Sequence, residues 1–156
     1  MKKVIMVLGY IFLVCIVALV AAAVALAVWG KKLDRESHAY VDTAVPAIAA
    51  NWDVAELQKR ASSEFNDAVD YESLEEDFFS LQQQLGKLVE YKGSTGDSNI
   101  TVSLNGYQIT ADYTAIADYE EGSVEIRTAL VKRGGQWKIL DFTVSPDAAA
   151  ESKDTI

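Results

Sequence analysis

The chain has 156 residues, with 14 basic and 23 acidic side chains and a formal net charge of −9 at pH 7. This acidic balance, without a contiguous basic patch, excludes nucleic acid as an expected partner, because nothing would meet the phosphates. The single cysteine excludes an intramolecular disulfide and a cysteine-based zinc site, so a folded domain must be held together by its core.

The first element is an apolar run from Val4 to Trp29 that contains no charged residue. As a helix rising about 1.5 Å per residue it would measure roughly 39 Å, enough to cross the hydrocarbon core of a bilayer with some tilt. We therefore predict a transmembrane segment over residues 1–30 and a protein held at a membrane by a single N-terminal span.

The length of this run favours an uncleaved signal anchor, since the apolar stretch of a cleaved signal peptide is about 7–15 residues long. Small residues at Ala21–Ala23 and Ala25–Ala27 leave cleavage open. Lys2 and Lys3 lie on a very short tail, whereas the chain after residue 30 carries 12 of the 14 basic and all 23 acidic residues, a formal charge of −11. A basic tail inside and a head outside is the usual signal-anchor orientation.

The sequence predicts neither a metal site nor a cofactor. His38 is the sole histidine and falls in a predicted juxtamembrane stalk over residues 31–45. The acidic residues of Glu72–Asp77 are explained by a helix N-terminus, and they lack the spacing of a calcium loop. Cys15 follows Phe12–Val14 and not the small residues that lipoprotein processing requires, so we interpret it as apolar filling.

A break in the chain is predicted at Thr43–Pro46, because Pro46 lacks a backbone N–H and disfavours helix at the preceding residue. A helix would then run over Pro46–Ala50, or one helix would continue from the stalk past a kink. Asp53 is the predicted N-cap of a short helix over Val54–Ala61.

A stronger helix is predicted over Leu74–Leu85, with Ser73 as its N-cap and Gly86 as its C-terminal signal. Its apolar residues recur at helical spacing and form one face. Between the two helices, Ser62 or Ser63 can cap a further turn.

After Gly86 the pattern alternates with the period of two that is typical of strands. The predicted strands are Leu88–Gly93, Asn99–Leu104, Tyr107–Tyr119, Ser123–Lys132 and Gln136–Val144. Asn105–Gly106 and Gly134–Gly135 are hairpin turns, and a bulge or bend is expected near Ala115–Ala117. These elements predict an α+β head over residues 46–146, with helices packed on a curved antiparallel sheet, followed by a flexible tail over residues 147–156.

The head resembles the NTF2-like (cystatin-like) α+β roll superfamily, and in particular small membrane-anchored bacterial proteins of unknown function. The resemblance covers roughly residues 37 to 146. The matching positions are Tyr40–Asp42, Pro46–Ile48, Trp52, Leu57, Arg60–Ser62, Leu85–Leu88, Ala111–Tyr113, Gly122 and Gly135–Ile139. It implies a bacterial cell-envelope protein of the inner (cytoplasmic) membrane with a periplasmic head. Because the superfamily includes isomerases, dehydratases, transport factors and scaffold domains, the resemblance implies a fold more than an activity.

The roll of this superfamily closes into a cone whose mouth can hold a small ligand. The aromatic residues that would line it are Trp52, Phe65, Phe78, Tyr91, Tyr107, Tyr113, Tyr119 and Phe142. The simpler interpretation is that they are core and rim aromatics, which a sheet face needs in any case. Asp112 and Asp118 each precede a tyrosine, as in an acid–tyrosine pair, but strand alternation turns the two side chains of each pair to opposite faces. We therefore predict no catalytic residues.

The last two strands are apolar on both faces, which is unusual for a half-solvated sheet. Ala129, Val131, Trp137 and Ile139 alternate onto one face, while Leu130, Leu140 and Phe142 alternate onto the other. The first set is covered by the N-terminal helices or the tail, or else forms a surface for a dimer or a partner.

Two hypotheses follow. The first is a non-enzymatic, membrane-tethered domain that associates with an envelope protein or a second copy through Val131, Trp137 and Ile139. The second is a binder, or more rarely an enzyme, for a small apolar molecule in the cone.

Overall fold

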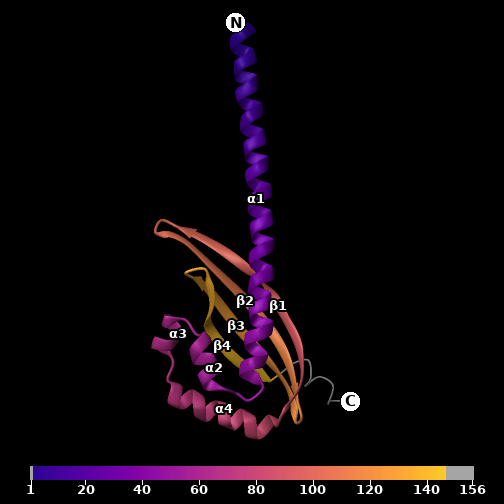
Figure 1. The fold of residues 1–156 in the computed structure, drawn as a ribbon, viewed down its shortest axis with the longest axis vertical. Helices are drawn as coiled ribbons and strands as arrows, with labels where there is room; N and C mark the ends of the chain where they lie inside the picture. Colours follow the sequence, from indigo (N-terminus) through magenta and orange to yellow (C-terminus); the bar gives the residue numbers. More distant parts are fainter. Residues whose placement is uncertain (1, 147–156) are drawn as a thin grey trace. The chain divides into compact units, whose positions relative to one another are not determined.

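The computed structural model describes residues 2–146 and has an α+β architecture, as predicted (Figure 1). Its elements are α1 (Lys2–Ala49), α2 (Val54–Arg60), α3 (Ser63–Ala68), α4 (Tyr71–Leu85), β1 (Leu88–Ser103), β2 (Gly106–Tyr119), β3 (Gly122–Arg133) and β4 (Gln136–Pro146). The chain divides into two compact units, residues 1–33 and residues 34–156. We call the second unit the head. The tail predicted over residues 147–156 lies outside the described residues.

The first unit is helical and apolar. Among the described residues, α1 is the one helix that is long and apolar enough to cross a membrane, and its most apolar window has a mean hydropathy of 3.2 with no residue buried. Leu19 is 70% exposed and Leu26 is 62% exposed. Exposed apolar side chains on every side of a helix are suited to a lipid environment, so this unit fits a transmembrane or signal anchor.

The head begins within α1, because one face of this helix over residues 34–49 belongs to the hydrophobic core. Val41, Val45 and Ile48 are each at most 1% exposed, and their spacing of three to four residues places them on one helical face. Residues 34–45, which were predicted as a juxtamembrane stalk, lie in α1 and include several core positions. The predicted break at Thr43–Pro46 is wrong, since the helix continues through Pro46, the alternative that the sequence left open. Burial of the residues on both sides offsets the backbone hydrogen bond that proline removes.

The end of α1 has an unusual residue in the left-handed conformation. The Asp53 N–H donates to the Ile48 carbonyl over 3.0 Å, which is the long hydrogen bond of a Schellman motif. This motif places Trp52 at the position that glycine usually occupies, with φ of 49°. The Trp52 side chain is 4% exposed, so core packing holds this residue in a conformation that its backbone disfavours.

The three helices that follow α1 are capped by side chains. Asp53 Oδ1 accepts from the Ala55 N–H over 2.9 Å at the start of α2, and Ser62 Oγ accepts from the Phe65 N–H over 3.1 Å at the start of α3. The Asp53 cap was predicted, and Ser62 is one of the two residues predicted for the second cap. In contrast, α4 begins earlier than predicted, because Asp70 is its N-cap and Ser73 instead donates its hydroxyl to the Asp70 carboxylate over 2.7 Å.

The sheet is an open antiparallel meander in the order β1-β2-β3-β4. The two strands predicted between Leu88 and Leu104 are one strand, β1. Its register against β2 shifts between Tyr91 and Ser94, opposite the predicted bend at Ala115–Ala117. On β2, Tyr113 and Tyr119 are buried. The core of the head is completed by further residues of at most 1% exposure: Ala44, Ala49, Leu57, Ala111, Ala115, Ala117, Ile126, Leu130, Val131 and Ile139.

A bulge in β4 explains why this strand looked apolar on both faces. Ala129 pairs with Asp141 and the next residue, Leu130, pairs with Ile139, so Leu140 is an extra residue on β4. A one-residue insertion exchanges the two faces of a strand beyond it. Ile139 therefore lies on the same face as Phe142, and the two-sided pattern in β4 disappears.

Candidate functional site

Three side chains on the head portion of α1 reach the sheet edge. Asp34, His38 and Asp42 recur every four residues, so they lie on one face of the helix. Their partners on β1 are Ser98, Ser94 and Tyr91. We call these six residues the polar seam.

The seam consists of directional hydrogen bonds. Asp34 Oδ1 accepts from the Ser98 N–H over 2.8 Å and also accepts from the Ser98 hydroxyl. Asp42 Oδ1 accepts from the Ser94 hydroxyl over 2.8 Å and from the Tyr91 hydroxyl over 2.9 Å. Both hydrogen bonds from Ser98 lower the pKa of Asp34 below its usual value.

His38 occupies the middle of the seam. Its Nε2 lies 2.9 Å from the Ser94 carbonyl oxygen and 3.3 Å from Asp42 Oδ2. Because a carbonyl accepts and cannot donate, this contact assigns a proton to Nε2. The imidazole also stacks on Tyr113, with ring centroids 5.6 Å apart and planes within 5° of parallel. His38 thus joins β1 and β2 to the helix.

The Tyr113 hydroxyl completes the link to β2. It lies 2.8 Å from Ser37 Oγ and 3.2 Å from the Asp34 carbonyl oxygen, to which it donates. Burial raises the pKa of Tyr113, and burial together with Asp42 raises the pKa of Tyr91. Both phenols are therefore neutral hydrogen-bond donors at pH 7, and not bases.

The seam covers the open edge of the sheet. β1 is an edge strand, with β2 as its one neighbour. The Ser98 N–H and the Ser94 carbonyl bind side chains of α1, so these backbone groups are not left to pair with another strand. On the opposite edge, the Ser62 N–H donates to the Ile139 carbonyl over 2.7 Å. Each edge is thus partly protected by the helical layer.

The seam has the chemistry of a structural link that holds α1 against the edge strand β1. Ser94, His38 and Asp42 have the residue types of a hydrolase triad, but the order of contacts differs. Asp42 accepts directly from Ser94 Oγ, and His38 Nε2 faces the Ser94 carbonyl oxygen. Nucleophilic catalysis requires a base between the hydroxyl and the carboxylate, and the seam places none there. Among the described residues, no group of three or more His, Cys, Asp or Glu is arranged to hold a metal ion.

The predicted cavity aromatics separate into several groups. Trp52 stacks on Tyr119 at 5.5 Å and meets Phe78 edge-on at 5.4 Å, and Phe78 meets Phe142 at 6.2 Å. We call these four residues the aromatic cluster. The Tyr119 hydroxyl donates to the Ala49 carbonyl over 2.8 Å and so caps the end of α1.

The other four aromatics lie elsewhere. Tyr91 and Tyr113 belong to the seam or contact it, Phe65 is buried on α3, and Tyr107 is 68% exposed near the end of the β1–β2 hairpin. The eight predicted residues therefore do not line one cavity. An open groove of about 390 Å³ does lie between α4 and β4. Its lining residues are Leu74, Asp77, Phe78, Ser80, Leu81, Phe142, Thr143 and Val144.

The predicted interaction face is largely buried inside the head. Val131 and Ile139 have no exposed surface, Trp137 is 7% exposed, and Ala129 is half-buried. The bridge between Ala61 and Ile139 brings the helical layer onto β4 at this point. The sequence left two alternatives for these residues, namely cover by the N-terminal helices or the tail, and a surface for a dimer or a partner. For Ile139 the structure favours cover by the N-terminal helices.

Trp137 is contacted by a charged side chain, that of Lys132. The Lys132 ammonium lies 5.4 Å from the Trp137 ring centroid, and it also binds Glu36 Oε2 over 2.8 Å. The helix residue Glu36 and the strand residue Lys132 therefore form a second polar link between α1 and the sheet, beside Trp137.

Comparisons of the chain with protein-family models, curated proteins and solved structures gave no match.

Proposed function

We propose that the chain is a non-enzymatic, membrane-tethered domain of the bacterial cell envelope. The anchor would lie in the cytoplasmic membrane, and the head would stand on the outer side and associate with an envelope protein or with a second copy. The polar seam is the observation that carries this proposal. Its titratable groups bind one another and the backbone of β1, and so serve to fix a helix to a sheet edge.

The organisation of α1 supports a tether. The same helix supplies the apolar run and five residues that are at most 1% exposed in the head core: Val41, Ala44, Val45, Ile48 and Ala49. The head is thus built in part from the helix that also carries the apolar run. This design suits a protein whose task is to hold a surface at a membrane.

The association surface differs from the one first predicted, because Val131, Trp137 and Ile139 are buried. Substituting Trp137 is therefore expected to unfold the head, and it cannot test association. Exposed positions on the sheet, such as Asp112 and Arg127, are the appropriate sites for interface variants.

Affinity capture of the full chain from gently solubilised membranes tests this proposal. We expect a stoichiometric envelope protein or a second, differently tagged copy to co-purify. A protein that stays monomeric and alone would contradict the proposal. The intact mass shows whether residues 1–30 remain attached. In a Cys15→Ala background, labelling of Gln136→Cys by a membrane-impermeant maleimide in intact cells tests the outward orientation of the head.

The groove between α4 and β4 favours a second function, the binding of a small apolar molecule. Phe78 and Phe142 both line this groove, and Leu74 and Leu81 extend its apolar wall. A membrane-permeant fluorescent fatty acid is a suitable probe, with Leu81→Asp as the variant expected to lose binding. Equal fluorescence with the wild-type chain and the variant would contradict this function.

We also propose that the head is an NTF2-like roll. Helices that precede an antiparallel sheet, together with bulges that bend this sheet, support the assignment. An experimental structure of the full chain, superposed on members of the superfamily, tests it.

A further inference from the structure

The β1–β2 hairpin ends in an exposed apolar tip. We call residues 99–109 the hairpin tip. Val102 is 78% exposed, Leu104 is 106% exposed and Tyr107 is 68% exposed. Val102 and Tyr107 are register partners across the two strands, so their side chains lie next to each other on one face. Such an exposed apolar group on a small head indicates a binding surface.

The hairpin tip projects beyond the rest of the sheet. The pairing of β2 with β3 begins at Thr110 and Val131, so residues 106–109 of β2 have no partner on β3. Figure 1 shows the β1–β2 hairpin extending past the β3–β4 hairpin. A two-stranded ribbon of this kind is marginally stable alone and gains from contact with a partner.

The hairpin tip is also uncharged. Residues 98–111, between Asp97 and Asp112, contain no Asp, Glu, Lys or Arg, although the chain after residue 30 has a formal charge of −11. A charged tip would be costly to bring into a bilayer interface, and an acidic one would be repelled by anionic lipid. Tyrosine and aliphatic residues are the types that favour the interface between lipid and water.

The polar seam sets the direction in which the hairpin tip points relative to the head portion of α1. Asp42 binds Tyr91 and Ser94, whereas Asp34, two turns closer to the N-terminus, binds Ser98. Moving towards the N-terminus of α1 therefore means moving along β1 towards its tip. The hairpin tip lies at the end of the head from which the chain continues to the apolar run.

Chain lengths allow the hairpin tip to reach the membrane surface. The five residues from Trp29, where the apolar run ends, to Asp34 span at most about 17 Å even when extended. The six residues of strand and turn from Ser98 to Leu104 span about 20 Å. Because Asp34 is bonded to Ser98, the hairpin tip is long enough to meet the bilayer that holds the apolar run.

We propose that the hairpin tip inserts Val102, Leu104 and Tyr107 into the interface of the bilayer in which the apolar run is embedded. The inference rests on the proposed membrane anchor and adds a second contact with lipid. One helix alone would let the head rotate about the helix axis. A second contact fixes which face of the head is presented to the aqueous side.

Quenching of a dye by brominated phosphatidylcholine tests this proposal on the full chain in nanodiscs that hold one copy each. A dye on Thr101→Cys, in a Cys15→Ala background, reports on the hairpin tip without removing an apolar side chain. The same dye on Gln136→Cys, in the turn between β3 and β4, is the matched control. A dye on the native Cys15 reports on the anchor.

We expect severalfold stronger quenching at Thr101→Cys than at Gln136→Cys, and loss of this excess when Val102, Leu104 and Tyr107 are all changed to Asn. These three side chains are exposed, so circular dichroism should be unchanged. Equal, weak quenching at the two positions, with Cys15 quenched, would overturn the proposal and leave the anchor intact. Absence of quenching at Cys15 would overturn the anchor as well. A third outcome is weak quenching at Thr101→Cys with one copy per disc, together with shielding of the dye when each disc holds two copies. This outcome would overturn the proposal and show that the hairpin tip contacts a second copy of the chain.

Discussion

The polar seam and the aromatic cluster fix the same helix to the same sheet by different physical means. At the seam, Asp34, His38 and Asp42 make directional hydrogen bonds to β1. At the end of α1, Trp52 packs on Tyr119 and Phe78 by apolar contact. Apolar packing supplies more free energy per residue, whereas the net contribution of a hydrogen bond is small and its geometry is strict. In this head, the aromatic cluster therefore contributes mainly stability, whereas the seam fixes the register of the helix against the strand.

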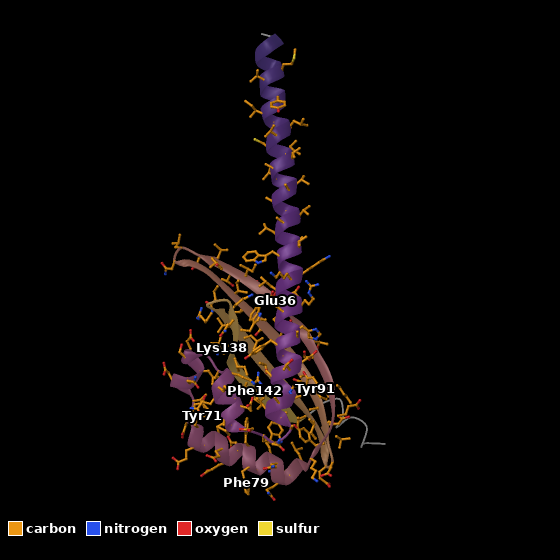
Figure 2. All side chains as sticks on the ribbon, in the orientation of Figure 1. Glu36, Tyr71, Phe79, Tyr91, Lys138 and Phe142 are labelled. Carbon is orange, nitrogen blue, oxygen red and sulfur yellow. The ribbon has the colours of Figure 1, made fainter. Side chains whose placement is uncertain are left out.

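The largest effect is expected from the aromatic cluster. Phe78→Ala should lower the free energy of unfolding by about 3–5 kcal/mol, because it removes a buried ring and leaves a cavity. Urea unfolding of the full chain in detergent micelles measures this loss. Phe79→Ala is the matched control, since Phe79 is 63% exposed and Figure 2 shows it pointing away from the sheet. A similar loss from both variants would contradict the assigned core.

The seam should give a smaller and strongly coupled effect. Asp42→Ala leaves the hydroxyls of Tyr91 and Ser94 without their acceptor, and we expect a loss of about 1–3 kcal/mol in the free energy of unfolding. In a double-mutant cycle with Tyr91→Phe, the two losses should not add, because both changes break one hydrogen bond. Strict additivity in urea unfolding would show that the two side chains act independently.

The left-handed conformation of Trp52 allows a test in which backbone and packing have opposite effects. Trp52→Ala and Trp52→Gly both remove the ring, but only glycine tolerates φ of 49° without a steric penalty. We therefore expect Trp52→Gly to be more stable than Trp52→Ala by about 1 kcal/mol in urea unfolding. The opposite order would show that the left-handed conformation is not kept in the variants.

The regular elements of the head could be predicted from the sequence, because local signals define them. Asp53 and Ser62 cap helices as their residue types indicate, and the β3–β4 turn falls at the predicted Gly134–Gly135. The β1–β2 turn lies one residue before the predicted Asn105–Gly106, at Leu104–Asn105 between the paired Ser103 and Gly106. At Pro46 the local preference favoured a break, and a continuous helix was only an alternative, because the core burial that overrides this preference cannot be read from local sequence. The bulge at Leu140 could not be predicted, because a bulge depends on how two strands pair and not on the sequence of one strand.

The candidate site was missed because its residues are ordinary when taken alone. Asp34, His38 and Asp42 do recur every four residues, and this spacing was the available signal for a polar helix face. Nothing in the sequence indicated that the face would meet Ser94 and Ser98 of a strand more than fifty residues away.

The smallest expected effect is a pH dependence that distinguishes the seam from the aromatic cluster. Hydrogen bonds from Ser98 lower the pKa of Asp34 in the folded head, so the folded state binds this proton less readily than the unfolded state. The resulting stability is complete above the unfolded pKa of about 3.9. It is lost as the pH falls through the lower, folded value. Asp34→Asn should therefore make unfolding less sensitive to pH between about 5 and 2, as measured by thermal melts in detergent.

Phe78→Ala is the control for this pH series. It removes an uncharged side chain, so it should lower the melting temperature by a similar amount at each pH and leave the acid sensitivity unchanged. An equal acid sensitivity in the wild-type chain and in Asp34→Asn would show that the carboxylate is not bonded to Ser98. The seam and the cluster would then differ in chemistry but not in their response to protons, and the edge of β1 would need another source of protection.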